Sequence, residues 1–582
     1  MVYEKILSEI SQSLLMQHTA EITKWVRLSG SEEEAHALEY VKGVLREYGY
    51  DVQEYSFESF VGYPESAELT ILSNDKMTYA GVPPALAPST PGICADLVYA
   101  GEGRGLASLD VDNKIVVFGR FSDPHLAKLA EEHGAIGEVF INDDHAHEGI
   151  VSVVWGTPTP ETSHLLPKTP SINITASQGK QLLTRLKEGT VTARLKTSAS
   201  RGWKKIPVMT GELKGKGDDF VLFSGHIDSW YYGAMDNAGA NAAMLEIARV
   251  TSAHRDLLKR GIRLAFWSGH SHGRYSGSTW YADNFWDDLH QHCVTHVNID
   301  SIGAKGASVL TEAGVMAEAK SFASSAVEQI AGQELTGARL TRAGDQSFWG
   351  LGIPSIFMEL SEQPLRTDAK TASFIFGPRS GGLGWWWHTR EDTLDKIDPS
   401  NLVRDTSIYL MIILGLCSSA ILPFDYSETA HEIERRLEEL QTAGKQLFDL
   451  THLIRRAARL RDLTAKLNHR IETFAGDENS SITAMSSAQK IDETLKRLGR
   501  LLIPVNYTRA GPFDQDQAVP IPMIPVLDRI VDLPKLNSDS DEFRFLTTRL
   551  RREANKVNYY LREAEDTVLK VLKDLEPPIA DG

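Results

Sequence analysis

The sequence VLFSGHIDSWYYGAMDNA, residues 221–238, brings one histidine and two aspartates together directly after an apolar run. The run is rich in β-prone residues and ends at a Ser-Gly pair, so it predicts a strand that opens into a loop. His226, Asp228 and Asp236 follow it. Imidazole and carboxylate groups are ligands of zinc-like ions, and an aspartate two residues after a histidine can hold the other ring nitrogen. A capped turn with a solvated aspartate has the same short motif, so a metal site needs further ligands downstream.

Strand and helix patterns alternate downstream of this segment. The expected order is strand 221–224, helix 240–250, strand 262–267, helix 277–286, strand 295–299 and helix 317–331. Such alternation predicts an α/β fold, with a mostly parallel sheet flanked by helices. Functional groups of such a sheet gather at the carboxyl ends of its strands. His226 follows the first strand and Asp300 the third, while His270 and His272 follow the second, so we expect these side chains to lie near one another.

The regions around this core differ from it in composition. We expect four parts: residues 1–60 as the N-terminal part of the α/β domain, 61–200 as a β-rich insert, 201–424 as the main α/β domain, and 425–582 as a helical domain. The insert consists of short β-prone runs broken by Gly and Pro, and the last part has amphipathic helical periodicity. Within the insert, residues 143–147 (Asp-Asp-His-Ala-His) are interpreted as a solvated polar loop without chemistry.

Composition limits the possible partners and compartment. The chain has 582 residues, 42% of them hydrophobic, and a net charge of −17, which argues against a nucleic-acid partner. Cys94, Cys293 and Cys417 are scattered, so they predict neither a disulfide framework nor a thiolate cluster, and a reducing compartment fits best. The N-terminus is acidic where an export signal would be basic, and the longest apolar run, residues 409–424, is shorter than the roughly 20 residues of a membrane span. We therefore expect a cytoplasmic protein without a membrane partner.

With these residues in place, the chain resembles the zinc metallopeptidases of the glutamate carboxypeptidase and transferrin receptor type over nearly its whole length. Residues 114–117 and 132–135 resemble that family's protease-associated insert, and residues 422–426 resemble the entry to its C-terminal helical domain. Residues 344–345 with 352–354 resemble the segment that packs beneath the family's site. The resemblance implies a metallopeptidase fold with a protease-associated insert and a helical domain that forms a homodimer.

The resemblance also assigns roles to the candidate ligands. By match to the family motifs, His226 and Asp300 would hold one metal ion. His388 would hold a second ion, and Asp236 would bridge the two. Asp228 would orient His226. The implied cofactor is a divalent transition metal, zinc first, with nickel, cobalt, iron or manganese as alternatives.

The chain departs from the family pattern at one place. Where the family has two consecutive glutamates, a general base and then a metal ligand, this chain has His270 and Ser271. Three interpretations stay open. His270 is the general base, since an imidazole with a pKa of about 6.5 accepts protons at neutral pH; His270 or His272 is a metal ligand and one ion dominates; or catalysis is lost and the fold is a binding module. The retained candidate ligands favour an active metalloenzyme.

The resemblance implies a metal-dependent hydrolase of the exopeptidase type, an amino- or carboxypeptidase acting on a short peptide or small molecule. The alternative is a metalloenzyme that cleaves a C–N or related bond in a non-peptide small molecule. Residues 385–387, three consecutive tryptophans, suit an apolar ligand wall in that case, although a stripe of indoles is more often part of the core.

Overall fold

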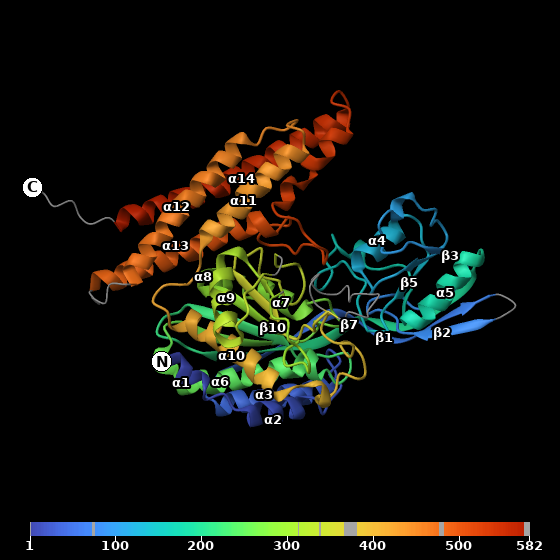
Figure 1. Cartoon of the computed structure of the whole chain (residues 1–582), viewed down its shortest axis with the longest axis horizontal. Helices are drawn as coiled ribbons and strands as arrows, with labels where there is room; N and C mark the ends of the chain where they lie inside the picture. Colours follow the sequence, from blue (N-terminus) through green and yellow to red (C-terminus); the bar gives the residue numbers. More distant parts are fainter. Residues whose placement is uncertain are drawn as a thin grey trace, which may run out of the picture.

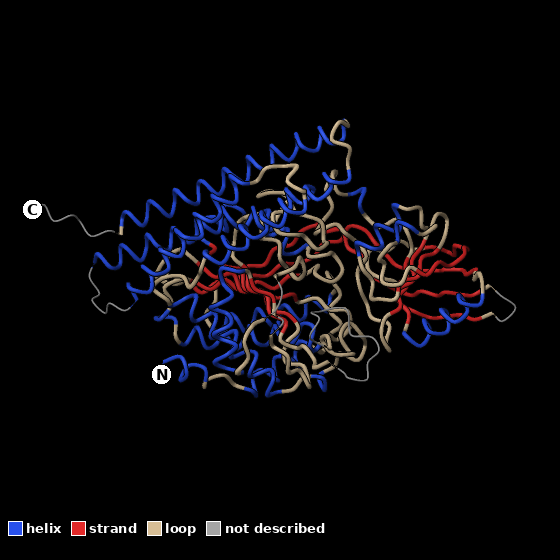
Figure 2. Tube along the Cα trace, turned by 45° about the horizontal axis from the view of Figure 1, so that its top comes forward, coloured by secondary structure: helices blue, strands red, loops and turns tan. Residues whose placement is uncertain are grey.

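A central α/β body, an insert at one end and a bundle of long helices along one side make up the chain (Figure 1). The computed structural model describes residues 2–72, 76–311, 313–336, 339–365, 381–475 and 482–575. In Figure 2 the strands of the central body run through its interior with helices outside them, and the strands of the insert form a separate group.

Four parallel strands form the part of the main sheet that matters for function. They are β8 (Phe220–His226), β9 (Gly261–Trp267), β10 (Cys293–Asp300) and β12 (Ser355–Glu359). β8 pairs in parallel with both β9 and β10, and β10 pairs in parallel with β12. The short β11 (Gly314–Val315) pairs antiparallel with β12. The carboxyl ends of the four parallel strands therefore lie at one edge, as the predicted α/β fold requires.

Alternate residues of β8 face two different cores, since side chains of a strand point to opposite faces. Val221 and Phe223 belong to the larger core, and Phe220 and Leu222 to the smaller one. Helices that contribute to the larger core include α1 (Val2–Leu7), α2 (Gln12–Ile22), α3 (Glu32–Glu47), α6 (Ala240–Ala253), α9 (Ala317–Ala331) and α10 (Pro399–Ser418). Those of the smaller core are α7 (Ser276–Asn284) and α8 (Trp286–His292).

Helix α10 is long and apolar enough to cross a membrane by length and composition alone, but 72% of its apolar window is buried inside the protein. Its Tyr409 hydroxyl donates hydrogen bonds to the backbone carbonyls of Asn298 in β10 and Met358 in β12. These contacts tie α10 to two central strands, so most of its apolar surface is used in packing inside the protein.

Two long antiparallel strands, β1 (Asp51–Ile71) and β7 (Thr192–Leu213), run from the main sheet into the insert. The insert adds β2 (Met77–Gly81), β3 (Thr90–Tyr99), β4 (Ile115–Phe118), β5 (Gly137–Ile141), β6 (Ser171–Ile174), α4 (Pro124–Glu132) and α5 (Ala176–Glu188). Strands β3 to β6 pair in parallel, in chain order. The expected domain boundaries near residues 60 and 200 fall inside β1 and β7.

The C-terminal helices are α11 (Tyr426–Ala443), α12 (Thr451–Ala475), α13 (Ile482–Tyr507) and α14 (Asp541–Asp574), with the 3-10 segment η6 (Pro525–Lys535) before the last. The bundle is anchored to the main sheet by the buried Arg500. Its guanidinium donates to the backbone carbonyls of Gly352 at 2.8 Å and Cys293 at 2.6 Å. It also donates to the backbone carbonyls of His290 at 2.9 Å and Leu289 at 3.3 Å, so four hydrogen bonds satisfy this buried guanidinium.

Candidate metal centre

His226, the last residue of β8, lies among buried carboxylates. Its Nε2 atom is 3.0 Å from Asp236 Oδ1 and 3.4 Å from Asp300 Oδ1, yet forms no well-aligned hydrogen bond. The other ring nitrogen, Nδ1, is 2.8 Å from the backbone carbonyl of Asp228. Because a carbonyl can only accept, Nδ1 carries the proton, and in the neutral ring the Nε2 lone pair faces two carboxylates. A cation between these three groups removes that repulsion, so the residues present fit a divalent metal.

The charges around His226 support the same conclusion. Burial lowers the pKa of His226, but Asp300, Asp228 and Asp236 outweigh it and raise the pKa well above its ordinary value. The site therefore attracts positive charge, whether a proton or a metal ion.

Asp236 joins His226 to His388, as the bridging role implied by the resemblance requires. Its second carboxylate oxygen, Oδ2, is 2.9 Å from His388 Nε2. Asp392, which the sequence analysis missed, supports the segment: its carboxylate accepts the backbone N–H groups of Met235 at 2.9 Å and Asp236 at 3.0 Å. Burial raises the pKa of Asp392 to about 7.

His270 lies against His226. The two rings stack with centroids 3.8 Å apart and an angle of 14°. His226, His270 and Asp300 each offer one ligand atom, and these atoms all lie within 4.8 Å of one another. His270 Nδ1 is 2.9 Å from Oδ2 of the fully buried Asp345. A carboxylate on one ring nitrogen fixes the ring and leaves the other nitrogen free to bind a metal.

His272 is not part of this group. Its Nδ1 is 2.9 Å from the Ser29 hydroxyl and 3.6 Å from Asp228 Oδ2. The ring is fully buried and tilts against Tyr63 and Trp230. Its contacts thus place it with Asp228 and Ser29 instead of with the ligand atoms, and the ligand role considered for His272 is not supported by this geometry.

Asp228 orients His226 by a different atom from the one expected. The bond to His226 comes from the Asp228 backbone carbonyl, while the nearer carboxylate oxygen is 3.6 Å from His226 Nδ1. The other oxygen, Oδ2, accepts hydrogen bonds from the Ser29 hydroxyl at 2.7 Å and the Ser271 backbone N–H at 2.9 Å. Asp228 therefore ties the loop after β9 to the loop after β8.

The turn after β9 that carries His270 depends on Gly269. Its φ is +78°, and a Cβ atom there would meet Ser276 Oγ at 2.2 Å. Only glycine adopts this left-handed conformation at that close approach without strain.

A segment of the insert, residues 142–149, holds His388 in place; we call it the insert strap. The Glu148 backbone N–H donates to the His388 carbonyl at 3.0 Å, and His388 Nδ1 donates to the Glu148 carbonyl at 3.0 Å. His147 bonds to the Trp387 carbonyl and is only 2% exposed. The interpretation of this stretch as a solvated loop is therefore wrong for His147, because the strap packs on the segment that carries a candidate ligand.

The three tryptophans before His388 differ in environment. Trp386 and Trp387 are 7% and 8% exposed and belong to the larger core. Trp385 is 41% exposed and stacks on His145 of the insert strap, with ring centroids 4.6 Å apart. Two of the three indoles thus have the core role, and only Trp385 offers surface to a ligand.

Glu359, at the carboxyl end of β12, is a second site residue that the sequence analysis missed. It is the parallel partner of Asp300 in the sheet register. Burial raises the pKa of Glu359 well above its ordinary value, and the charges of Asp300, Glu362 and Asp236 add to that rise. An apolar run that ends in an ionisable residue, the signal that singled out His226, is also present in residues 355–359.

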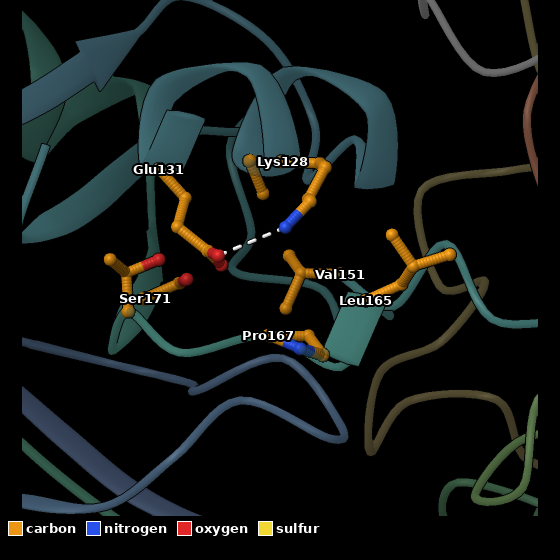
Figure 3. A pocket seen from close by; sticks show the side chains of 8 residues that line it. Lys128, Glu131, Val151, Leu165, Pro167 and Ser171 are labelled. Carbon is orange, nitrogen blue, oxygen red and sulfur yellow. Dashed lines mark hydrogen bonds and ion pairs between the residues drawn. The ribbon is translucent and has the colours of Figure 1, made fainter. Parts of the chain in front are cut away.

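A small hollow in the insert lies apart from these groups (Figure 3). Its charged lining residues, Lys128 and Glu131, face each other with a nitrogen-to-oxygen distance of 2.9 Å. These two charges neutralise each other and no imidazole lines the hollow, so it offers no ligand set like the one at the main sheet.

A parallel sheet whose carboxyl edge gathers imidazoles and carboxylates is typical of an α/β protein that binds a divalent metal ion there. Residues 209–413 match the family model of Peptidase family M28. The match confirms the resemblance found in the sequence and the prediction of a metallohydrolase related to exopeptidases.

Relatives and solved structures agree with this assignment. The chain is 23% identical over 503 residues to a probable glutamate carboxypeptidase, VP8, of Zea mays, covering 72% of this chain and 68% of the relative. It is 26% identical over 419 residues to a probable lipoprotein aminopeptidase, LpqL, of Mycobacterium tuberculosis, covering 66% and 80%. The fold is similar to that of an aminopeptidase from Aneurinibacillus sp. strain AM-1, with a TM-score of 0.54 at 22% identity over 72% of this chain and 96% of that chain.

Proposed function

We propose that the protein is an exopeptidase-type hydrolase with one dominant zinc ion. The ligands are His226, His270 and Asp300, with the Asp236 carboxylate completing the set. The observation that carries the proposal is the convergence of the first three within 4.8 Å, since His270 stands where the family has a glutamate. A mixed set of imidazoles and carboxylates suits zinc, and nickel, cobalt, iron or manganese are the alternatives to be tested.

The residue that stands in place of the family's second glutamate supports a single ion. Ser271 supplies no carboxylate there, and His270 lies with His226, which leaves Asp236 and His388 as the remaining ligands. Two dications a few Å apart repel each other strongly unless carboxylates offset the repulsion. A second ion, held by Asp236 and His388, would therefore be bound more weakly than the first.

The bound metal would supply a Lewis acid that polarises an amide carbonyl and activates water. With His270 assigned as a ligand, the proton of the attacking water needs another acceptor. His388 Nε2, 2.9 Å from Asp236 Oδ2, is our candidate for that acceptor. The Glu148 carbonyl holds the opposite ring nitrogen and so keeps the His388 ring turned toward Asp236.

Metal analysis of the purified protein tests the proposal. We expect about one zinc ion per chain after dialysis, and a second ion in the double variant His270→Glu with Ser271→Glu, which restores the family's two carboxylates. Two tightly held ions in the unchanged protein would contradict a one-ion centre.

A second candidate function is cleavage of a C–N or related bond in a non-peptide small molecule. The replacement of the family's general base favours it, as does Trp385, which is 41% exposed three residues before His388 in the sequence. An untargeted substrate screen with the zinc-loaded protein separates the two: turnover of peptides or amino-acid amides favours the exopeptidase. A catalytically inactive binding protein is disfavoured by the retained ligand cluster, and turnover of any substrate excludes it.

We also propose that the helical bundle forms a homodimer, that the insert is of the protease-associated type, and that the protein works in the cytoplasm. Phe545 is 72% exposed and Tyr559 49% exposed, on the long amphipathic helix α14. Exposed aromatic residues of this kind are enriched in interfaces. Light scattering at micromolar concentration tests the dimer, and a folded monomer would contradict it.

All three cysteines are unpaired, which suits a reducing compartment.

A further inference from the structure

A buried arginine of the N-terminal segment, Arg27, contacts both ends of the loop that joins two of the proposed metal ligands, residues 227–233. At the start of the loop, the Arg27 guanidinium donates a hydrogen bond to the backbone carbonyl of Ile227 at 2.8 Å. At the end of the loop, it donates to the carbonyls of Tyr232 at 2.8 Å and Gly233 at 3.1 Å. One side chain therefore ties the two ends of this loop together.

The same arginine attaches the loop to the N-terminal segment. Its guanidinium also donates to the carbonyls of Ile22 at 3.1 Å and Trp25 at 3.0 Å, so its five hydrogen bonds among the described residues all go to backbone carbonyls. The Ser229 backbone N–H donates to the Arg27 carbonyl at 2.8 Å, and the Arg27 backbone N–H donates to the Ser229 hydroxyl at 3.2 Å. The loop is thus fixed at its middle as well as at its ends.

At the start of the loop, Arg27 affects the orientation of His226. The Ile227 carbonyl belongs to the same planar peptide group as the Asp228 nitrogen. Asp228 in turn accepts a hydrogen bond from His226 Nδ1 at its backbone carbonyl, 2.8 Å away. Holding the Ile227 carbonyl therefore restricts the position of the Asp228 backbone, and with it the direction in which His226 Nε2 points.

At the end of the loop, Arg27 affects the position of Asp236. Gly233 has a φ of +53°, and a Cβ atom on it would meet the Asp236 backbone carbonyl at 2.2 Å. The end of the loop therefore lies directly against the Asp236 backbone. Because Arg27 fixes this end to the start of the loop, it helps to set the arrangement in which His226 Nε2 lies 3.0 Å from Asp236 Oδ1.

Two properties of Arg27 are relevant here, its charge and its shape. Burial lowers its pKa to about 10, so the guanidinium stays charged at neutral pH. A lysine would supply the same charge, but from a single ammonium group with three donors. The carbonyls that Arg27 contacts belong to two separate segments of the chain, and a planar fork with five donors is suited to reach all of them. The geometry therefore favours the fork, more than the charge, as the feature that holds the loop.

We propose that Arg27 is a positioning residue of the metal centre, whose hydrogen-bond fork holds His226 and Asp236 at the separation at which one ion binds between them. The inference rests on the proposed metal centre. It goes beyond that centre because the bonds of Arg27 go to the backbone of the loop and not to ligand side chains, so the fold arranges the two ligands before the ion arrives.

The test compares the unchanged protein with Arg27→Lys, which keeps the charge and loses the fork. The matched control is Arg500→Lys, since Arg500 is also buried and donates to four backbone carbonyls, including that of Cys293 at the opposite end of β10. Competition with a chelator gives the zinc affinity. The visible absorption spectrum of the cobalt-loaded protein reports the coordination geometry, and the melting temperature without metal reports stability.

We expect Arg27→Lys to lower the zinc affinity about 10- to 100-fold, the usual effect of losing a group that orients metal ligands, and to alter the cobalt spectrum. Arg500→Lys should lower the melting temperature and keep both the zinc affinity and the cobalt spectrum. A milder variant, Ser229→Ala, removes the hydroxyl that accepts from Arg27 and donates to the Tyr231 carbonyl at 2.6 Å. It should lower the zinc affinity about fivefold, the effect of one buried hydrogen bond.

An unaltered zinc affinity or an unaltered cobalt spectrum in folded Arg27→Lys overturns the inference. An equal loss of zinc affinity in Arg500→Lys also overturns it, because the effect would then be one of general destabilisation. If Arg27→Lys does not fold, Ser229→Ala decides, and an unaltered zinc affinity in that variant overturns the inference.

Failure of the proposed function is a separate outcome. Arg27-dependent zinc binding without turnover of any substrate would refute the hydrolase and keep the inference. Turnover by the unchanged protein, together with full zinc affinity in Arg27→Lys, would do the reverse. Absence of zinc binding in the unchanged protein would refute both.

Discussion

The main sheet and the insert both bury carboxyl groups beside parallel strands, but the neighbours of those groups differ. Asp236, at the edge of the main sheet, lies between His226 and His388. Burial raises its pKa, but the two imidazoles outweigh burial and bring the pKa well below the ordinary value. Glu138, in β5 of the insert, is also fully buried and receives a hydrogen bond from the Ser171 hydroxyl at 2.7 Å. Burial raises its pKa to about 8.

Equal burial therefore leads to opposite protonation states. A carboxyl group that faces imidazoles stays ionised and can hold a metal, whereas one that faces hydroxyls stays neutral and only completes a hydrogen-bond network. The composition of the immediate neighbourhood, more than burial, distinguishes a metal centre from a structural polar group in this fold.

The largest expected effect is the loss of the metal centre. Replacing His226 and Asp300 together by Ala removes one imidazole and one carboxylate from the ligand group, so bound zinc should fall to background and turnover by about 10³-fold or more. Elemental analysis and rates of the purified variant measure both. Unchanged stoichiometry in a folded double variant would show that the cluster at the main sheet does not hold the ion.

The next effect separates the two histidines of the loop after β9. His270→Ala should lose most of its zinc, because the ring lies with the other ligands. His272→Ala should keep its zinc, because His272 bonds to Ser29 and lies behind Asp228. The measurement is zinc content at matched free-metal concentration. If both variants keep full metal and full activity, His270 is neither ligand nor base, and the one-ion centre proposed above is wrong.

A smaller effect is expected at Asp345, which fixes the His270 ring. Asp345→Asn keeps the shape but weakens the contact to His270 Nδ1, 2.9 Å away. Loss of such a supporting contact lowers metal affinity about 10- to 100-fold. Competition with a zinc chelator measures the affinity, and Glu391→Gln serves as the matched surface control. An unaltered zinc affinity would show that Asp345 has no influence on the metal centre.

Much of the main sheet could be predicted from the sequence, because buried parallel strands are continuous apolar runs. The expected strands 262–267 and 295–299 lie within β9 and β10, and helix 317–331 has the ends of α9. The place of Pro504 could not be predicted, since proline ordinarily ends or kinks a helix but Pro504 lies inside α13.

The candidate site was predicted only in part, and the missing part depends on contacts between distant segments. His226, Asp236 and Asp300 could be found because each follows an apolar run. The support that Glu148 gives to His388 spans 240 residues of sequence, so no local pattern reveals it. The choice between His270 and His272 likewise depended on where Ser29 and Asp345 lie, which only the folded chain shows.

The smallest effect concerns the insert, where Glu138→Gln should change stability without changing the metal. The pKa of Glu138 is about 8 in the folded chain, against an ordinary value of 4.5. The folded state therefore holds the proton more tightly than the unfolded state, so the stability contributed by this group is full below pH of about 4.5 and falls until pH of about 8.

Glutamine is never ionised and keeps an oxygen for the Ser171 hydroxyl. As the pH increases from about 5 to 9, Glu138→Gln should therefore become more stable than the unchanged protein, by an unfolding free energy on the order of a few kcal/mol. The melting temperature of the variant should rise accordingly relative to that of the unchanged protein. Glu188→Gln, an exposed carboxylate of the same insert, is the control and should follow the unchanged protein. If the melting temperatures of all three proteins change with pH in the same way, Glu138 is ionised in the folded protein. The contrast drawn between Asp236 and Glu138 would then be wrong for Glu138.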